Sequence, residues 1–510
     1  MSNAAVLPGK DAPQDACQKI CEVNAPVQAA PHVYPPGCAF HSLTDIAGKK
    51  ITVMGLGLNH GGEESARFFL AHGAALTVTD TRTRAELLAA VEALEAEGGN
   101  LRFVLGEHRI PDFADADVVI KNPGIKYDGN EYLAAARAIE TDISVFLAFT
   151  KAPVIAVTGS KGKSSTASAV HFCLCCAGFT AFLGGNITVN PLSFLLRTGP
   201  DTPVVLELSS WQLADLRGRG VLKPTIAVIT PIFADHQNWY GAMAPYIADK
   251  KLIYADQDDG DWTVCAAQDQ WAAIFERETR GRFVHIPELE EAVSRQGQKQ
   301  SRLPAPSLPA IRVPGEHNRR NALTAATVLS LLGVAPDSVT AGLAQWPGIP
   351  HRLEYFHTWQ LCGGPEVRFY NDTTATVPEA AAAAIHAFDR PVHLVAGGTD
   401  KHCDWAPLAA ACGETASIHL LAGTGTDRLT PLLTGGGTDF YGPYDSLDAL
   451  LGHVQAFLQK IPGRDAPQTV VFSPGATSFG MFKNEFDRGD TFKAKVREQF
   501  SAKSKKVKKF

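Results

Sequence analysis

Val154-Ile155-Ala156-Val157-Thr158-Gly159-Ser160-Lys161-Gly162-Lys163-Ser164-Ser165 is the stretch that decides the fold of the central part of this chain. A β-branched apolar run leads directly into Gly-x-x-Gly-Lys-Ser, and an Ala-rich segment follows. This order predicts a strand, a phosphate-binding loop and a helix. The glycines let backbone N–H groups face an anion at the helix N-terminus, Lys163 reaches the β- and γ-phosphates, and Ser164 ligates Mg²⁺. The sequence therefore predicts that the chain binds a nucleoside triphosphate.

Length and composition indicate a globular α/β protein. The 510 residues suggest about three domains, and 45% of the residues are hydrophobic. The net charge of −6 gives no general basic field for nucleic acid. No segment approaches the roughly 20 apolar residues of a membrane span, and no secretory signal is visible. The ten cysteines are dispersed, which favours reduced thiols. We therefore expect a cytoplasmic protein without nucleic-acid partners.

The first part of the chain has a loose segment and then a nucleotide-binding pattern. Residues 1–45 are rich in Pro, Ala and polar residues and are expected to form a flexible N-terminal extension, with ordered structure beginning at Ile51. A strand, a Gly-rich turn, a helix and a second strand are then predicted at residues 51–54, 55–62, 63–72 and 76–79, ending at Asp80. This order predicts a Rossmann-like half. His60 stands at the third Gly position of the turn, so NAD is not favoured.

Strands and helices alternate through the rest of the chain. Further buried strands are predicted at residues 117–120, 204–206, 226–229, 367–370, 392–395 and 470–472, and a helix at residues 321–326. The predicted fold class is therefore α/β with three domains. They are a Rossmann-like N-terminal domain at residues 46–145, a central P-loop ATPase-type domain with a parallel sheet at 146–347, and a C-terminal Rossmann-like α/β domain at 348–500, followed by a basic tail at 501–510.

Polar residues stand where two of the predicted strands end. Glu207 follows the strand at 204–206, and Asp235-His236 lie beyond the strand at 226–229. Open parallel sheets bind ligands at the carboxyl ends of their strands, so Glu207 can hold Mg²⁺ opposite Ser164. A surface Glu without a role is the alternative. For His236, a magnesium or catalytic role and no special role are equally open.

Two asparagines lie three residues apart at a predicted helix start. Because residues at this spacing are neighbours on a helix surface, the amides of Asn318 and Asn321 are expected to share one face. Helix capping explains one of them but accounts less well for the pair.

Together these motifs resemble the Mur ligases, the ATP-dependent amide-forming enzymes of peptidoglycan precursor synthesis, and among them the glutamate-adding members. The motifs that carry the resemblance are Gly55–Leu58, Thr158–Ser165, Gly184–Ile187, Glu207–Leu213, Asp235-His236, His317-Asn318 with Asn321, Gly348–Glu354, Asn371-Asp372 and Ser473–Ser478. The resemblance covers roughly residues 50–500 and all three predicted domains.

The resemblance implies a reaction and its cofactors. ATP phosphorylates a substrate carboxylate, and the amine of glutamate then attacks the acyl phosphate. The isomer of glutamate that the resemblance favours is D-glutamate. The implied acceptor is UDP-N-acetylmuramoyl-L-alanine, and the implied cofactors are ATP and two Mg²⁺ ions. Implied catalytic residues are Lys163, Glu207, His236 and Lys250, and implied metal ligands are Ser164, Glu207, His236 and Lys250. The spacing from Tyr246 favours Lys250 over its neighbour Lys251 as the lysine that this family carbamylates, and a solvated lysine on a helix face is the alternative. We expect a monomer.

The same resemblance implies the binding residues. For ATP they are Gly159, Ser160, Lys161, Gly162, Lys163, Ser164, Ser165, Asn318, Asn321, His351, Arg352 and Asp372. For the UDP-muramoyl substrate they are Leu58, Asn59, Asp80, Thr81, Arg82, Asn122, Gly124, Asn186, Ser209 and Gln212. For glutamate they are Thr376, Lys401 and Ser478, of which the lysine offers a cation to a carboxylate.

Two departures from the family pattern keep alternatives open. Thr374 replaces a lysine expected near the ATP phosphates, and Lys161 is a possible substitute for it. Glu485-Phe486 stand where an aromatic residue followed by an acid is typical, near the glutamate pocket. The alternatives are an enzyme that uses L-glutamate and a nucleotide-binding homologue that has lost catalysis.

Overall fold

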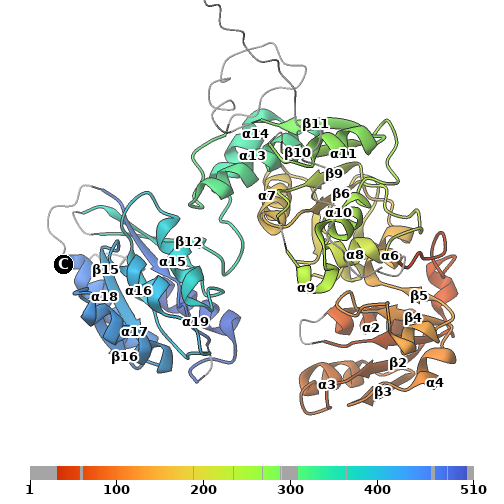
Figure 1. Cartoon of the computed structure of the whole chain (residues 1–510), viewed down its shortest axis with the longest axis horizontal. Coiled ribbons are helices and arrows are strands. Elements are labelled where there is room, and N and C mark those ends of the chain that lie inside the picture. Colours follow the sequence, from red (N-terminus) through yellow and green to blue (C-terminus); the bar gives the residue numbers. More distant parts are fainter. Residues whose placement is uncertain are drawn as a thin grey trace, which may run out of the picture. The chain divides into compact units, whose positions relative to one another are not determined.

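The computed structural model describes residues 31–57, 61–187, 189–233, 235–266, 268–287, 289, 308–361, 364–460, 466–478 and 480–501. Helices and strands alternate along the chain, which confirms the predicted α/β class (Figure 1). The chain divides into two compact units: the described residues up to Lys161 with Phe182–His285, and Gly162–Ala181 with the described residues from Ile286 onward. None of the described helices is both long and apolar enough to cross a bilayer.

The first sheet has the strand order β3-β2-β1-β4-β5, and each pair is parallel. Its elements are β1 (Lys50–Met54), α2 (Gly61–Ala71), β2 (Ala75–Asp80), α3 (Leu88–Glu97), β3 (Leu101–Leu105), α4 (Ile110–Ala114), β4 (Val118–Lys121), α5 (Glu131–Ala134), β5 (Ile139–Glu140) and α6 (Asp142–Phe149). The strand order reverses between β1 and β4, and Rossmann-like sheets bind their ligands at this point. The strands predicted at 51–54, 76–79 and 117–120 are confirmed. The strand β3 was not predicted, because Arg102 interrupts a short apolar run.

Ordered structure begins before Ile51, so the expected flexible extension is wrong for residues 34–45. Tyr34 and Phe40 are only 4% and 2% exposed, and the Tyr34 N–H donates to the Arg217 carbonyl at 2.9 Å. A short 3-10 helix, η1, spans Leu43–Ile46. This segment is held by tertiary contacts and has no internal periodicity, which is why its sequence looks unstructured. Residues 1–30 lie outside the described part.

The second sheet has the order β11-β10-β9-β6-β8-β7, and the strand pairs from β10 to β7 are parallel. Its strands are β6 (Val154–Thr158), β7 (Phe182–Gly185), β8 (Val204–Glu207), β9 (Ile226–Ile229), β10 (Trp262–Ala266) and β11 (Arg282–Ile286). The neighbouring helices in sequence are η2 (Pro191–Arg197), α8 (Ser210–Ala214), α9 (Gln237–Tyr240), α10 (Met243–Lys251) and α11 (Ala272–Glu278). The strands β6, β8 and β9 are buried throughout, as their apolar runs predict.

In the second unit, α7 (Lys163–Cys176), α13 (Glu316–Leu331) and α14 (Pro336–Gln345) pack on one another. The third sheet has the order β12-β13-β17-β14-β15-β16. Its elements are β12 (Glu354–Gln360), β13 (Glu366–Asn371), α15 (Pro378–His386), β14 (His393–Ala396), α16 (Ala406–Cys412), β15 (Ser417–Leu421), α17 (Thr424–Gly435), β16 (Tyr441–Tyr444), α18 (Leu447–Lys460), β17 (Gln468–Phe472) and α19 (Glu485–Gln499).

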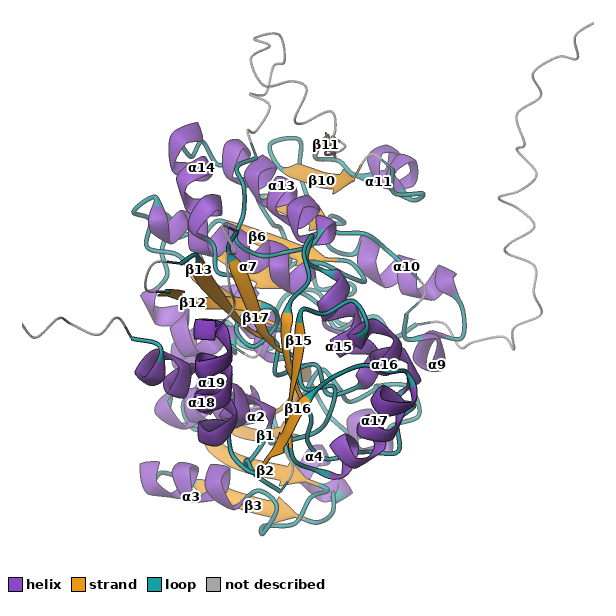
Figure 2. Cartoon of the chain, turned by 90° about the vertical axis from the view of Figure 1, so that its left-hand side faces the viewer, coloured by secondary structure: helices purple, strands orange, loops and turns teal. Residues whose placement is uncertain are grey.

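Helices cover both faces of the third sheet, with α18 and α19 on one side and α15, α16 and α17 on the other (Figure 2). The strands predicted at 367–370, 392–395 and 470–472 are confirmed. The edge strand β12 pairs antiparallel with β13, while the other pairs are parallel. An antiparallel edge on an otherwise parallel sheet is common, and β12 was not predicted.

Candidate active site

The first half of the phosphate loop follows β6. Gly159 has a φ of +141°, and a Cβ there would collide with the Thr230 hydroxyl, so this position requires glycine. The Ser160 hydroxyl accepts a hydrogen bond from the Phe233 N–H at 3.0 Å and lies 2.9 Å from the Tyr246 hydroxyl. The loop is therefore held against the segment after β9 and against α10.

The second half of the motif caps and opens α7. Gly162 is the N-cap, with a φ of +89°, and a Cβ on it would lie 2.5 Å from Asn321 Oδ1. Lys163, Ser164 and Ser165 form the first turn of α7. The first N–H groups of a helix have no partner within the helix, and they carry a partial positive charge. The element can therefore bind an anion, as the sequence predicts.

A buried carboxylate lies at the end of β8. Glu207 is 1% exposed, and its Oε1 accepts a hydrogen bond from Asn186 Nδ2 at 2.9 Å. Its Oε2 is buried and has no hydrogen-bond partner among the described residues. Leaving such an atom unpaired is costly, and carboxylate oxygens are the protein ligands of Mg²⁺. Glu207 therefore fits the predicted magnesium role.

His236 is more exposed than Glu207. Its φ is +53°, its side chain is 44% exposed, and its Nε2 lies 3.8 Å from Asp235 Oδ2. The ring centroid is 5.0 Å from that of Trp211. Across the described segments, no three His, Cys, Asp or Glu side chains are grouped to hold a metal ion. Mg²⁺ commonly keeps several waters and uses substrate phosphates as ligands, so a magnesium role for His236 needs no such cluster.

Adjacent lysines in α10 have different surroundings. Lys250 is 1% exposed, and its Nζ donates to the Gly159 carbonyl at 2.8 Å and lies 4.4 Å from the Tyr246 ring centroid. Lys251 instead pairs with Glu278 at 2.8 Å. Of the two lysines, Lys250 is therefore the one beside the phosphate loop.

Asn318 and Asn321 are buried on one face of α13. The Asn321 amide donates to Asn318 Oδ1 at 3.5 Å, and the Asn318 amide donates to the Pro314 carbonyl at 2.7 Å. The expectation of a shared face is confirmed. The capping alternative is wrong, because the N-cap is Gly315 and neither asparagine caps the helix.

The other predicted ATP residues lie beside β12 and β13 of the third sheet. Asp372 accepts hydrogen bonds from the Leu353 N–H at 3.0 Å and the Ser473 hydroxyl at 2.7 Å. Burial raises the pKa of Asp372 to about 6. His351 has a φ of +66°, and burial lowers its pKa. Arg352 is exposed.

Two of the three predicted glutamate residues are brought together. Lys401 Nζ donates to Thr376 Oγ1 at 3.4 Å. Ser478, 5% exposed, lies in the wall of a cavity of ≈ 300 Å³ at the carboxyl ends of β14 and β15. The cavity is lined by Gly397, Gly398, Thr399, Leu421, Ala422, Gly423, Thr477, Ser478, Gly480, Met481, Phe482 and Arg488.

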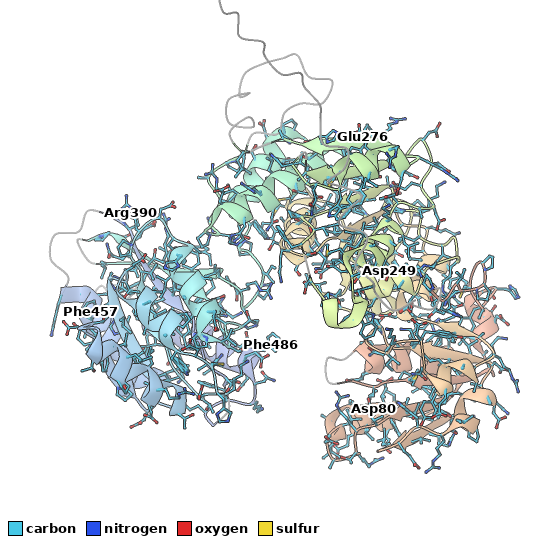
Figure 3. The ribbon with its side chains drawn as sticks, viewed as in Figure 1. Asp80, Asp249, Glu276, Arg390, Phe457 and Phe486 are labelled. Carbon is cyan, nitrogen blue, oxygen red and sulfur yellow. The ribbon has the colours of Figure 1, made fainter. Side chains whose placement is uncertain are left out.

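The predicted uridine pocket is partly described. Asp80 lies at the end of β2 (Figure 3), where it accepts hydrogen bonds from the Gly57 N–H at 3.1 Å and the Arg82 N–H at 2.9 Å. Thr81 is exposed beside them. Leu58 and Asn59 lie outside the described residues. The Gly-rich turn and the acidic strand end therefore lie together, as the Rossmann pattern predicts.

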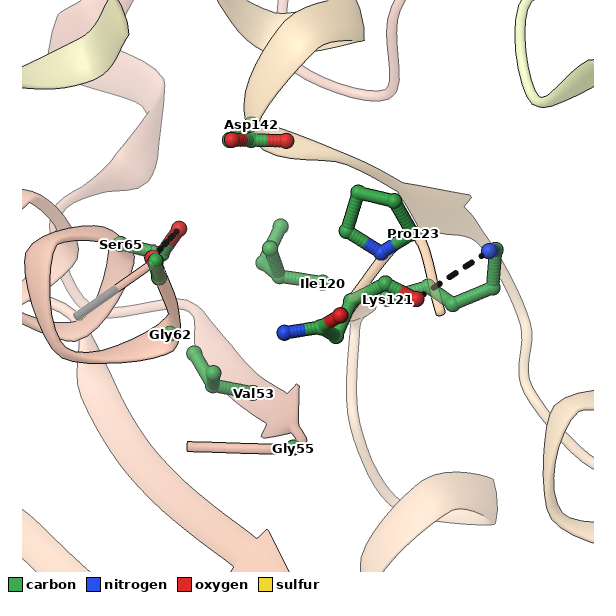
Figure 4. Close-up of a pocket in the computed structure, with 10 residues that line it drawn as sticks. Val53, Gly55, Gly62, Ser65, Ile120, Lys121, Pro123 and Asp142 are labelled. Carbon is green, nitrogen blue, oxygen red and sulfur yellow. Dashed lines mark hydrogen bonds between the residues drawn. The ribbon is translucent and has the colours of Figure 1, made fainter. Parts of the chain in front are cut away.

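The turn after β4 borders a small cavity of ≈ 30 Å³ at the switch point between β1 and β4 (Figure 4). Asn122 Oδ1 accepts a hydrogen bond from the Gly124 N–H at 3.1 Å, which closes the turn. Asp142 faces the same cavity, and loss of solvation raises its pKa to about 6. In α8, Ser209 and Gln212 form a reciprocal capping box. Four of the predicted substrate residues, Asn122, Gly124, Ser209 and Gln212, thus stand on two turns that their own hydrogen bonds close.

Sequence reasoning missed several residues that hold these elements. Asn190 donates from its amide to the Gly61 carbonyl and to Ser65 Oγ, both at 2.8 Å, at the N-terminus of α2. Lys121 and Asp215 form a buried ion pair of 2.8 Å between β4 and the end of α8. These partners are roughly a hundred residues apart in the chain and form no local motif, so no pattern in the sequence identified them.

Comparisons with known proteins identify relatives of this chain. The family described as the Mur ligase middle domain matches residues 157–329, and the family described as the Mur ligase MurD-like N-terminal domain matches residues 49–145. A UDP-N-acetylmuramoylalanine–D-glutamate ligase of Treponema pallidum is 42% identical, covering 89% of this chain and 98% of the relative. One of Borreliella burgdorferi strain ZS7 is 35% identical, covering 88% and 98%.

A solved structure shares the fold. The crystal structure of the UDP-N-acetylmuramate–alanine ligase MurC of Thermotoga maritima has a TM-score of 0.51, with 18% identity, 88% of this chain and 100% of that chain covered. At this identity the likeness concerns the fold alone. The family matches and the full-length relatives lead to one conclusion: the chain belongs to the Mur ligase family.

Proposed function

We propose that this protein is an ATP-dependent, ADP-forming ligase that adds D-glutamate to UDP-N-acetylmuramoyl-L-alanine in peptidoglycan precursor synthesis. The relatives carry this activity in their names over nearly their whole length. The observation in the structure that carries the proposal is Glu207, a buried carboxylate with an unpaired oxygen at the end of β8, next to the phosphate-loop strand β6. This arrangement suits a magnesium nucleotide.

The reaction balances as two steps. An oxygen of the alanine carboxylate attacks the γ-phosphorus of ATP, ADP leaves, and an acyl phosphate forms. The glutamate amine then attacks the acyl carbon, inorganic phosphate leaves, and the nitrogen loses a proton as the amide forms. Both steps need charge neutralisation and an amine held in line. Lys163 and the first turn of α7 are suited to the phosphates, and Ser164, Glu207 and His236 to magnesium.

We propose that Lys250 is carbamylated. The lysine ammonium loses one proton, the resulting neutral amine attacks carbon dioxide, and a second proton is released as the carbamate forms, which would supply an anionic ligand for a second Mg²⁺. The burial of Lys250 beside the phosphate loop, in contrast to the Lys251–Glu278 pair, supports this choice. Labelling with ¹³C-bicarbonate should give a carbamate signal that the Lys250→Arg variant lacks.

The remaining predicted residues keep their roles as proposals. We assign Gly159–Ser165, Asn318, Asn321, His351, Arg352 and Asp372 to ATP. We assign Leu58, Asn59, Asp80, Thr81, Arg82, Asn122, Gly124, Asn186, Ser209 and Gln212 to the UDP-muramoyl substrate. Thr376, Lys401 and Ser478 are assigned to glutamate, supported by the Lys401–Thr376 contact and by the cavity beside Ser478.

The departures from the family pattern have structural counterparts. The Thr374 hydroxyl donates to the His351 carbonyl at 2.8 Å, so it supports the nucleotide segment and supplies no charge. Lys161 is 75% exposed and lies 3.8 Å from Asp235, which leaves it able to move to a phosphate. Phe486 packs against the His351 ring, with centroids 5.4 Å apart. An L-glutamate enzyme is the alternative that Glu485 and Phe486 keep open.

We further propose the domain boundaries 46–145, 146–347 and 348–500, a monomer, and a cytoplasmic location that fits the nucleotide substrates. The strands β1–β5, β6–β11 and β12–β17 each fall within one of these ranges.

ADP formation with ATP, Mg²⁺, D-glutamate and UDP-N-acetylmuramoyl-L-alanine tests the function, with each substrate omitted in turn. We expect turnover only in the complete mixture. ATP binding without turnover would favour the non-catalytic homologue.

A further inference from the structure

Lys121 is a buried cation whose ammonium group has two hydrogen-bond acceptors and one ion-pair partner. It is 2% exposed at the end of β4. Its Nζ donates to the Asn122 carbonyl at 3.3 Å and the Ile125 carbonyl at 2.8 Å, and it pairs with Asp215 Oδ2 at 2.8 Å. Figure 4 shows the side chain turned back to the Asn122 carbonyl. An ammonium group has three donor hydrogens, so Lys121 both closes the turn after β4 and binds α8.

Asp215 is held as firmly on the other side. It is the C-cap of α8 and 6% exposed. Its Oδ1 accepts a hydrogen bond from the Tyr34 hydroxyl at 3.1 Å, and its carbonyl accepts one from Arg219 Nε at 2.7 Å. The Arg219 guanidinium lies 4.3 Å from the Tyr34 ring centroid. Tyr34, in a segment that looked unstructured in the sequence, therefore contacts one side of the pair.

The pair joins the two turns that carry the proposed substrate contacts. Asn122 and Gly124 lie in the turn that Lys121 closes, and Ser209 and Gln212 lie at the start of the short helix that Asp215 ends. A buried ion pair is weak support for stability, because desolvation offsets much of its attraction. Such a pair does fix the local geometry, because a buried charge has few other partners available.

We infer that Lys121 and Asp215 are positioning residues for the UDP-muramoyl substrate: their ion pair sets the Asn122–Gly124 turn against the Ser209–Gln212 turn at the spacing the substrate needs. The inference rests on the proposed function. The observed contacts of the pair are with the Asn122 and Ile125 carbonyls, Tyr34 and Arg219, so it should act on affinity for this substrate and not on affinity for ATP or glutamate.

The test compares the wild-type protein with a double variant of the pair and with a control variant of a neighbouring buried ion pair. Lys121→Met with Asp215→Asn removes both charges together, so neither is left buried without its partner. The control is Glu140→Gln, which breaks the buried Glu140–Arg219 pair of 3.0 Å without touching either turn. Calorimetric Kd and steady-state KM for UDP-N-acetylmuramoyl-L-alanine are measured with KM for ATP and D-glutamate, kcat and Tm.

We expect the double variant to raise Kd and KM for the UDP-muramoyl substrate about 10-fold, with KM for ATP and kcat within about 2-fold of wild type. Glu140→Gln should lower Tm and leave that Kd unchanged. The inference would be overturned if the double variant had a lower Tm but unchanged Kd and KM, or if its KM rose equally for every substrate. If wild type binds the UDP-muramoyl substrate but shows no turnover, the proposed function fails while the Kd comparison still decides the inference. If wild type does not bind that substrate, both fail.

Discussion

At the scale of single residues, the phosphate loop is the part of the site whose requirements are clearest. Gly162 and Gly178 both have a φ of +89°, but only a side chain at Gly162 would meet another group, Asn321 Oδ1. A Cβ on Gly178 has nothing within 4 Å. Alanine should therefore strain the backbone equally at both positions, but only at Gly162 would it also meet a residue of the proposed site. The two variants form a matched pair.

Gly162→Ala should lower kcat/KM for ATP by about 100-fold, because it shifts the start of α7 away from Asn321. Both variants should lose ~1 kcal/mol of unfolding free energy. Gly178→Ala should nevertheless keep the wild-type kcat/KM for ATP. ATP-dependence kinetics and urea unfolding of both variants check this. Equal kinetic losses in the two variants would show that strain, and not the contact, is responsible.

Glu207→Gln should separate activity from stability. It keeps the shape and the hydrogen bond from Asn186 but removes a buried charge whose Oε2 is unpaired. We expect kcat to fall about 10²–10³-fold and more Mg²⁺ to be needed, with Tm equal to or above that of wild type because the desolvation cost disappears. Magnesium titrations and thermal melts provide the measurement. A variant with full activity and a lower Tm would mean that Glu207 is structural.

At the scale of elements, β15 carries a buried histidine with no role in the proposed reaction. His419 is fully buried, and its Nε2 lies 2.9 Å from the Ser417 hydroxyl, which in turn lies 2.8 Å from His393 Nδ1. Burial, followed by the neighbouring His453 and His393, lowers the pKa of His419 to about 3. The folded third domain therefore holds this ring neutral.

Acid should weaken the third domain through His419. Between its ordinary pKa of 6.5 and about 3, the unfolded state binds the proton and the folded state does not. Unfolding free energy then falls by up to ~1.4 kcal/mol per pH unit below 6.5, or about 2 kcal/mol at pH 5, and is unaffected above 6.5. Urea unfolding at pH 7 and pH 5 should show this loss reduced in His419→Gln. His386→Gln, at a side chain 52% exposed, should match wild type. Equal acid sensitivity in all three proteins would contradict the assignment.

How much the sequence revealed depended on how local each feature is. The phosphate loop, Glu207 at the end of β8 and the strands β1, β2, β4, β6, β8, β9, β13, β14 and β17 follow from short runs of residues, and these elements were predicted. The pairs Lys121–Asp215 and Asn190–Gly61 join distant parts of the chain, and each member alone is an ordinary polar residue. The packing of residues 34–45 was missed for the same reason, since only tertiary contacts order that segment.

At the scale of the whole molecule, the described residues form three sheets, and each sheet has side chains of the proposed site at the carboxyl ends of its strands. Asp80 ends β2, Glu207 ends β8, and Asp372 follows β13. Parallel sheets present their loops at this edge, so the proposed uridine, magnesium and ATP residues can each use the same architectural position.

The central claim is the addition of D-glutamate to a UDP-muramoyl substrate. Its most direct test is phosphate release by the full-length protein with ATP, Mg²⁺ and UDP-N-acetylmuramoyl-L-alanine, with D-glutamate and L-glutamate supplied separately and EDTA as a control. The account predicts release with D-glutamate alone, abolished by EDTA. Release that prefers L-glutamate, or no release with either isomer, would contradict it.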